Sequence, residues 1–502
     1  MGKDLILSEY SGKNEVLSFI RISYLRDMEV FSNLAEIQTA LKSGQLELIH
    51  LVNYYVGRIK EFKELNAFLE VFEEEALLRA NKVQEKIKNG TSGKLTGMVI
   101  GLKDNICYAG HQVSASSKIL ENYTSPYSAT VVERLLAEDA IIIGRLNCDE
   151  FAMGASNESS YFGPVKNFAD YNKVSGGSSG GAAVAVQADL CLAALGTDTG
   201  GSVRQPAAFC GVIGLKPTYG RVSRHGIISY ASSFDQVGPI AKNIDDAALL
   251  LEIIAGADNY DSTASSLPVE HYSQKLSVST GSKRIAYLSE ALTSPGLDPE
   301  IKSAFVCQIN KLKEAGHTVE PVSFEYLEYV VPTYYILTMA EASSNLARYD
   351  GIHYGFRSAG ATSLETTYKK SRSEGFGKEV KRRIMLGTFV LSAGYYDAYY
   401  AKAQKVRRLI RDKTDAILNQ FDFILLPTTP TPAFAIGEKN DDPIVKYLAD
   451  IFTVQASLAG VPAISIPMGN NMEGMPLGIQ VLGKRFGEAE LLSFSKHLKE
   501  II

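Results

Sequence analysis

The sequence is poor in the features that mark secreted, membrane or metal-binding proteins. Its five cysteines are odd in number and form no C-x-x-C pair, and its seven histidines form no H-x-H or H-x-x-x-H pair. This spacing argues against a disulfide framework and against a zinc site, so no bound metal is predicted. The sequence has no uninterrupted run of about 18 apolar residues, so no membrane-spanning helix is expected.

Targeting signals are also absent. The N-terminus, Met1-Gly2-Lys3-Asp4, has no apolar core of a secretory signal, and Ile6 breaks the myristoylation pattern. These absences predict a cytoplasmic protein with no membrane attachment. The net charge is −5, from 51 basic and 56 acidic residues, and the densest basic cluster is only Lys381-Arg382-Arg383. Because no basic block is long enough to follow a phosphate backbone, another subunit is expected to hold any nucleic acid.

The hydrophobic pattern changes along the chain. Residues 31–85 have helical spacing interrupted at Ser43-Gly44, and from Met98 short apolar runs alternate with helical segments. Predicted strands cover 98–102, 140–146, 190–195, 284–288, 318–322, 421–427, 463–467 and 478–482; predicted helices cover 128–138, 180–187, 243–255, 300–315 and 488–499. We therefore predict one α/β domain over residues 31–502, with a mostly helical excursion at about 326–420. Residues 1–30 form an N-terminal extension to which no role is assigned.

Two glycine-dense turns are the most specific feature of the sequence. The first is Gly176-Gly177-Ser178-Ser179-Gly180-Gly181, and the second is the segment 197–206, Thr-Asp-Thr-Gly-Gly-Ser-Val-Arg-Gln-Pro. Each contains a serine, Ser178 and Ser202, which lie 24 residues apart, and Lys103 precedes the first serine by 75 residues. No G-K-[ST] follows either turn, which disfavours a nucleotide-binding P-loop.

A serine hydroxyl attacks an amide only with a base and a site for the oxyanion. A lysine acts as that base when it is neutral, and burial lowers its pKa from about 10.4 by disfavouring the charged form. Lys103 follows the apolar run Val99-Ile100-Gly101-Leu102, a plausible place for burial. A lone lysine of this kind more often extends along a strand edge with its charge in water; the two serine turns favour the catalytic interpretation here.

The second turn also supplies backbone donors. Thr199, Gly200 and Gly201 present successive N–H groups just before Ser202, with little side chain in the way. They are the predicted oxyanion hole. The alternative is that the glycines form an anion-binding nest.

The two turns and Lys103 resemble the Ser-Ser-Lys triad of the amidase signature family, and the resemblance continues from Ala207 to Gly211 and at Gly238-Pro239. It implies the amidase signature fold, an α/β architecture with a mixed central sheet covered by helices on both faces. It also implies that Lys103 takes a proton from Ser178, and that Ser178, on a cis peptide, takes one from the nucleophile Ser202. Asp198 and Arg204 are expected to hold the second turn in place rather than to contact substrate.

The C-terminal half narrows the resemblance. The segments 371–384, 394–400 and Asp441-Asp442-Pro443 resemble the glutamine-hydrolysing subunits of bacterial aspartyl/glutamyl-tRNA amidotransferases. This implies that the chain hydrolyses glutamine and passes ammonia to a partner in a heterotrimer with subunits B and C. The partner would bind ATP, Mg²⁺ and the aminoacyl-tRNA, either Glu-tRNA(Gln) or Asp-tRNA(Asn), so no cofactor is predicted for this chain.

Free glutamine carries a carboxylate and an ammonium, and a selective pocket needs an opposite charge for each. The resemblance places the carboxylate on Arg383 and the ammonium on Asp450, with Tyr334 lining the pocket. The neighbouring Arg382 is the alternative to Arg383, and both arginines would also suit a solvated helix face. Asp450 would also suit the surface, and Tyr334 the core.

Two other functions remain open from the sequence. One is a stand-alone amidase of the same family acting on fatty, aryl or peptide amides. The other is a scaffold subunit whose triad is present but idle. The sequence does not decide which tRNA is served, and it reveals no route for ammonia.

Overall fold

The computed structural model describes residues 31–276, 281–438 and 449–502. The predicted extension 1–30 and the motif Asp441-Asp442-Pro443 lie outside these ranges. Within them, no helix has both the length and the apolar character needed to cross a membrane.

A single mixed sheet of eleven strands runs through the molecule, in the order β1-β3-β2-β4-β6-β5-β10-β11-β9-β7-β8. β2 is parallel to β3 and β4, and β7 is parallel to β8 and β9, whereas the other neighbours are antiparallel. The strands are β1 (Phe68–Val71), β2 (Val99–Lys103), β3 (Ile141–Leu146), β4 (Ala193–Asp198), β5 (Ile213–Lys216), β6 (Gln236–Ala241), β7 (Arg284–Leu288), β8 (Thr318–Val322), β9 (Phe423–Pro427), β10 (Ala463–Asn470) and β11 (Pro476–Leu482).

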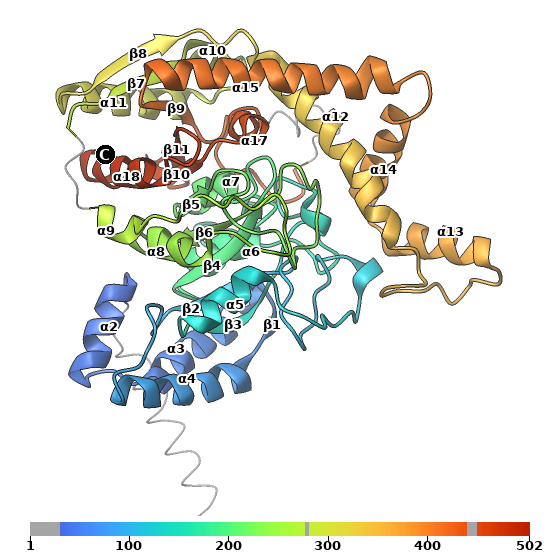
Figure 1. Cartoon of the computed structure of the whole chain (residues 1–502), viewed down its shortest axis with the longest axis horizontal. Helices are drawn as coiled ribbons and strands as arrows, with labels where there is room; N and C mark the ends of the chain where they lie inside the picture. Colours follow the sequence, from blue (N-terminus) through green and yellow to red (C-terminus); the bar gives the residue numbers. More distant parts are fainter. Residues whose placement is uncertain (1–30, 277–280, 439–448) are drawn as a thin grey trace, which may run out of the picture.

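Helices cover the sheet, and Figure 1 shows the N-terminal helices at one end and a helical projection at the other. The helices of the sheet region are α2 (Leu34–Ser43), α3 (Leu48–Glu61), α4 (Glu73–Lys88), α5 (Thr130–Ala137), α6 (Gly180–Gln187), α7 (Arg204–Cys210), α8 (Ile244–Ile254), α9 (Tyr272–Lys275), α10 (Ser289–Thr293), α11 (Pro299–Glu314), α17 (Val454–Ala459) and α18 (Glu488–Ile501). The predicted fold class, a mixed sheet between helices, is confirmed.

The central strands are mostly apolar and lie in the interior. All five residues of β2 and all six of β3 and β4 are buried, as expected for parallel strands covered on both faces. α8 shows how the flanking helices begin: the side chain of Asn243 accepts from the Asp246 N–H at 2.7 Å and caps the first turn. Its buried Leu250 and Leu251 then join the core.

The segment between β8 and β9 is helical, as the sequence predicts. Its described residues form no strand; they form α12 (Leu327–Asn345), α13 (Leu364–Gly375), α14 (Lys378–Val390), a π-helical turn (Tyr396–Ala401) and α15 (Lys402–Gln420). In Figure 1 α12, α13 and α14 extend away from the sheet, with α13 at the far end, whereas α15 runs back toward β9. A second apolar cluster, which includes Val330 and Leu337 of α12, joins the excursion to the sheet.

Two sequence predictions need correction, and two strands were not predicted. Residues 31–85 are not wholly helical, because Phe68–Val71 pairs with β3 as the edge strand β1. The strand predicted at 190–195 begins only at Ala193: the Leu190 N–H bonds to Ala185 O and closes the end of α6. β5 and β6 were not predicted, and their pairing with strands distant in sequence explains why local patterns did not reveal them.

Candidate active site

The predicted triad residues gather at the carboxyl ends of two parallel strands. Lys103 is the last residue of β2, which pairs with β4, and Ser202 lies in the turn between β4 and α7. The first glycine turn, with Ser178, leads into α6, which packs on β4. Carboxyl ends of parallel strands are where α/β proteins usually place their reactive groups.

Lys103 is completely buried against the first glycine turn. Its Nζ lies 2.7 Å from Ser178 Oγ, 2.9 Å from Ser179 Oγ and 3.4 Å from the carbonyl oxygen of Thr197. Burial lowers the pKa of Lys103 to about 8, although neighbouring carboxylates such as Asp149 act in the opposite direction. With a pKa of about 8, Lys103 has a neutral minority at pH 7 and is mostly neutral above pH 8, and the neutral form is what a general base requires.

Ser178 and Ser202 lie on adjacent segments of backbone. The Ser179 N–H donates to the carbonyl oxygen of Ser202 at 3.1 Å, and the Gly177–Ser178 peptide bond is cis, as the resemblance implies. Among the described residues, no hydrogen bond joins the two serine hydroxyls directly. Ser202 keeps 8% of its surface exposed whereas Ser178 is fully buried, so Ser202 is the serine that a substrate reaches.

A buried ion pair holds the second turn, as the sequence predicts. Arg204 Nη2 lies 3.0 Å from Asp198 Oδ1, and the same guanidinium donates to the Thr453 carbonyl oxygen at 2.9 Å. Although burial opposes ionisation, Arg204 holds the pKa of Asp198 below its usual value. The turn is therefore fixed on both sides before a substrate arrives.

The three predicted oxyanion donors are not equivalent. The Gly201 N–H already donates to Asp198 Oδ1 at 2.8 Å, whereas the hydrogen bonds of the described residues leave the Thr199 and Gly200 N–H groups unengaged. Gly201 has a φ of +136°, and a Cβ there would lie 2.4 Å from Thr453 Oγ1. The Thr199 and Gly200 N–H groups therefore stay available to an oxyanion, whereas the geometry of Gly201 suits a conformational role.

Two of the predicted pocket residues, Arg383 and Tyr334, lie on the helical excursion. Arg383 of α14 is 4% exposed, and its guanidinium lies 5.5 Å from the Tyr230 ring and 5.2 Å from the Tyr335 ring. Its Nη1 donates to Tyr230 Oη at 2.9 Å. Both Arg382 and Arg383 pair with Glu379, but the side chain of Arg382 is 37% exposed. Burial between aromatic rings favours Arg383 over Arg382 as the pocket arginine.

Asp450 contacts the same aromatic group. Tyr335 Oη donates to Asp450 Oδ2 at 2.7 Å, and burial raises the pKa of Asp450 to about 6. Tyr334 stacks edge-on against Tyr335 and packs over the second turn, where a Cβ on Gly200 would meet its ring at 2.4 Å. Tyr334 thus joins the arginine and carboxylate to the turn that carries Ser202.

Two acidic residues that no sequence motif singled out, Asp149 and Glu150, connect the serine turns to the arginine pocket. The Asp149 N–H donates to the Ser178 carbonyl oxygen at 3.1 Å, and the Glu150 carboxylate accepts from the Gly377 N–H at 2.9 Å. Gly377 precedes α14, the helix that carries Arg383. Asp149-Glu150 thereby links the triad to the pocket, and no motif in the sequence signalled that contact across 227 residues.

Replacing Glu150 by glutamine is expected to raise the KM of an amide substrate held by Arg383 about 5-fold at pH 8, since a charge at a helix N-terminus contributes about 1 kcal/mol. Burial raises the pKa of Glu150 to about 7, so the wild-type carboxylate is ionised above that pH and protonated below it. The variant and the wild type should therefore converge as the pH falls to 6. Steady-state KM values from pH 6 to 8.5 test this, and a constant ratio across the range would contradict it.

This fold and a buried lysine beside two serine turns are the features expected of a serine hydrolase with a lysine base in place of histidine. The comparison with known proteins is more specific. A family model described as Amidase matches residues 50–492, and the chain belongs to that family, the amidase signature enzymes. The sequence-based recognition is thus confirmed.

Individual relatives share nearly the whole chain. A protein of Chlorobium phaeobacteroides, named as the A subunit of glutamyl-tRNA(Gln) amidotransferase, is 49% identical over 467 residues, 93% of this chain and 98% of that protein. The crystal structure of the A subunit of glutamyl-tRNA(Gln) amidotransferase from Thermotoga maritima matches with a TM-score of 0.74 and 39% identity, covering 93% of each chain. The peptide amidase of Stenotrophomonas maltophilia matches with a TM-score of 0.78 at 30% identity, covering 93% of this chain and 96% of that one.

Proposed function

We propose that this protein is the glutaminase subunit of a tRNA-dependent amidotransferase, the one that its relatives' names call the A subunit. The observation that carries the proposal is a buried arginine and a carboxylate, Arg383 and Asp450, that both contact Tyr335. The neighbouring Tyr334 packs over Gly200 in the turn that carries Ser202. The arginine suits the α-carboxylate of glutamine and the carboxylate suits its α-ammonium. The likeness to relatives with that name supports the same assignment.

The chemistry begins with neutral Lys103. It takes a proton from Ser178, Ser178 takes one from Ser202, and Ser202 Oγ attacks the side-chain amide carbon of glutamine. The Ser202 hydroxyl must turn toward Ser178 for this step. The Thr199 and Gly200 N–H groups stabilise the oxyanion, at about 3 kcal/mol per donor. Protonation of the leaving nitrogen releases ammonia and leaves a glutamyl ester on Ser202, which water hydrolyses to glutamate.

Ammonia is then used elsewhere in the complex. We place ATP, Mg²⁺ and the aminoacyl-tRNA on a partner subunit, in a heterotrimer with subunits B and C. The chain has a net charge of −5, which supports leaving the tRNA to a partner. Activation of Glu-tRNA(Gln) or Asp-tRNA(Asn) on that partner would consume the ammonia. Since aminoacyl-tRNA is its acceptor, we assign the complex to the cytoplasm.

The main alternative is a stand-alone amidase, because the chain is also similar to a peptide amidase. A peptide amide or an aryl amide lacks the free carboxylate and ammonium of glutamine, so Arg383 and Asp450 would have no matched charges to bind. The buried arginine therefore favours glutamine. An idle scaffold is disfavoured because Lys103, Ser178 and the N–H groups of the second turn are in place.

Replacing Arg383 by alanine tests the substrate. The KM for glutamine should rise at least about 30-fold, since losing one partner of a buried charge pair costs about 2 kcal/mol or more. The kcat/KM for an uncharged primary amide such as propionamide should change less than about 3-fold, because that amide has no carboxylate to lose. Arg382→Ala is the matched control. Equal losses on both substrates would point instead to a stand-alone amidase.

A further inference from the structure

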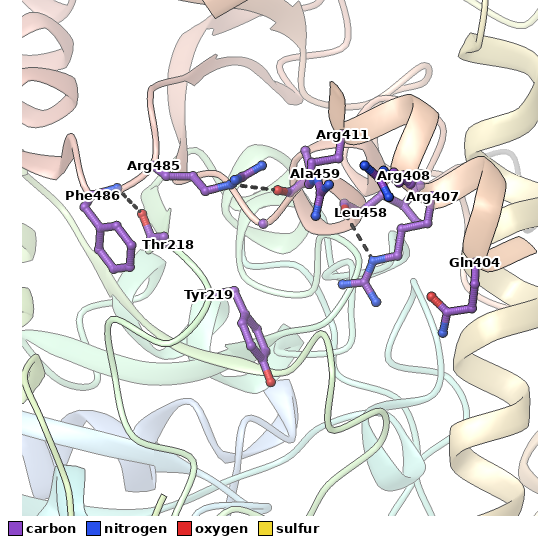
Figure 2. A pocket seen from close by; sticks show the side chains of 11 residues that line it. Thr218, Tyr219, Gln404, Arg407, Arg408, Arg411, Leu458, Ala459, Arg485 and Phe486 are labelled. Atoms are coloured by element: carbon purple, nitrogen blue, oxygen red, sulfur yellow. Dashed lines mark hydrogen bonds between the residues drawn. The ribbon is translucent and has the colours of Figure 1, made fainter. Parts of the chain in front are cut away.

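A second hollow, separate from the triad, is lined by arginines. Its volume is about 470 Å³, and Figure 2 shows the side chains around it. Arg407, Arg408 and Arg411 come from α15, and Arg485 comes from the segment after β11. The remaining lining includes Tyr219, Leu458, Ala459 and Phe486, so apolar surface lies next to the charges.

The positive charge around this hollow is concentrated on α15, in contrast to the net negative charge of the chain. α15 carries six basic and two acidic residues, whereas the whole chain has a net charge of −5. The two acidic residues, Asp412 and Asp415, only partly offset the arginines: they pair with Arg411 at 3.0 Å and with Arg485 at 2.7 Å. The side chains of Arg408 and Arg411 are 75% and 43% exposed, so both are accessible from outside.

One arginine connects the hollow to the glutamine pocket. Arg407 lies 4.0 Å from the centre of the Phe234 ring and donates to Ser233 at 3.0 Å. Phe234 packs edge-on against Tyr334, with ring centres 5.7 Å apart. An anion bound to Arg407 in the hollow would therefore affect Phe234 and, through it, Tyr334, the pocket residue that covers the second glycine turn.

We propose that the arginine hollow binds carboxylate side chains of an acidic segment from a partner subunit of the amidotransferase, and that this contact stabilises the glutamine pocket. The inference rests on the proposed function, because it assigns the partner. Guanidinium groups bind carboxylates through charge-assisted hydrogen bonds, and Arg411 and Arg485 already donate such bonds to Asp412 and Asp415. The neighbouring Leu458 and Phe486 suit the aliphatic part of a Glu or Asp side chain.

A carboxylate fits better than a nucleic-acid backbone. Binding a phosphate chain requires basic residues along an extended track, whereas these four arginines surround one hollow. The rest of the chain has a net negative charge, which would repel a long polyanion. A short acidic segment of a protein meets neither obstacle.

The test compares Arg408→Glu/Arg411→Glu with Lys302→Glu/Lys313→Glu, a charge-matched control on exposed positions of α11. Each variant is titrated with the purified B and C subunits from the same organism, and Kd is measured by calorimetry. We expect the first variant to raise Kd at least 10-fold while glutamine hydrolysis by the isolated chain stays within 2-fold of wild type. The stimulation of hydrolysis by the partners should also fall, and the control should match wild type. Arg408→Gln/Arg411→Gln repeats the comparison if charge reversal lowers the melting temperature.

Each outcome decides between the alternatives. An unchanged Kd in both arginine variants overturns the proposal. A gel-shift titration with tRNA forms the second arm: tRNA binding by the isolated chain that depends on Arg408 and Arg411, with an unchanged partner Kd, assigns the hollow to nucleic acid instead. If wild-type protein assembles with its partners but never hydrolyses glutamine, the proposed function fails while the Kd comparison still tests the hollow.

Discussion

Replacing Ser202 by alanine is expected to abolish glutamine hydrolysis, with a loss of about 10⁶-fold in kcat, the scale seen when a serine nucleophile is removed. The reason is that Ser202 alone among the three triad side chains reaches solvent and can meet the amide carbon. The fold should be unaffected, because the alanine keeps the Cβ and the Ser202 carbonyl still accepts from the Ser179 N–H. Glutamate release and the melting temperature measure the two effects.

Ser179→Ala is the matched control for this prediction. Ser179 Oγ lies 2.9 Å from Lys103 Nζ, nearly as close as Ser178 Oγ, but Ser179 has no assigned role in the relay. Its loss should lower kcat less than about 10-fold, below the range of about 10²–10⁴-fold for a general acid–base group. A labelled glutamyl ester trapped on the Ser202→Ala protein would show that another residue is the nucleophile.

Replacing Lys103 by methionine should lower kcat by at least about 10⁴-fold, because the members of a proton relay act as one unit. Methionine preserves most of the buried volume and removes a charge that burial disfavours, so the melting temperature should not fall. Lys103→Arg should be equally inactive, because a guanidinium stays protonated and cannot act as the base. Activity retained by either variant would exclude Lys103 from the relay.

The same lysine sets the expected pH dependence. Burial lowers the pKa of Lys103 to about 8, and only its neutral form accepts a proton. The kcat/KM should therefore rise with pH through about 8 and then level off, provided no other group titrates there. A profile that falls over the same interval would mean that the protonated form is the active one.

The candidate active site could be predicted from the sequence because each of its central residues lies in a short, recognisable pattern. Glycine-rich segments predict turns, and the apolar run before Lys103 predicts a strand. The structure brings these three segments together. The alternation of apolar runs predicted most strands and helices within a few residues. β7 and β8 have the same limits in the prediction and in the structure.

What the sequence could not provide depends on contacts distant in the chain. Glu150 and Gly377 are 227 residues apart, and only the folded chain reveals that the carboxylate of one accepts from the N–H of the other at the start of α14. Gly201 has the residue type of an oxyanion donor, but its N–H is engaged by Asp198. Only the folded chain shows that the Arg383 guanidinium is buried between aromatic rings whereas Arg382 is exposed, which favours Arg383 as the pocket arginine.

The division between the sheet and the helical excursion has an evolutionary consequence. Lys103, Ser178 and Ser202, the proposed catalytic groups, lie in the buried centre of the molecule, at the end of β2 and in the turns that lead into α6 and α7. Arg383 and Tyr334 instead lie on helices inserted between β8 and β9. Such an insertion tolerates remodelling without disturbing the reactive centre, so descendants of one ancestor can exchange one amide for another while conserving the same catalytic residues.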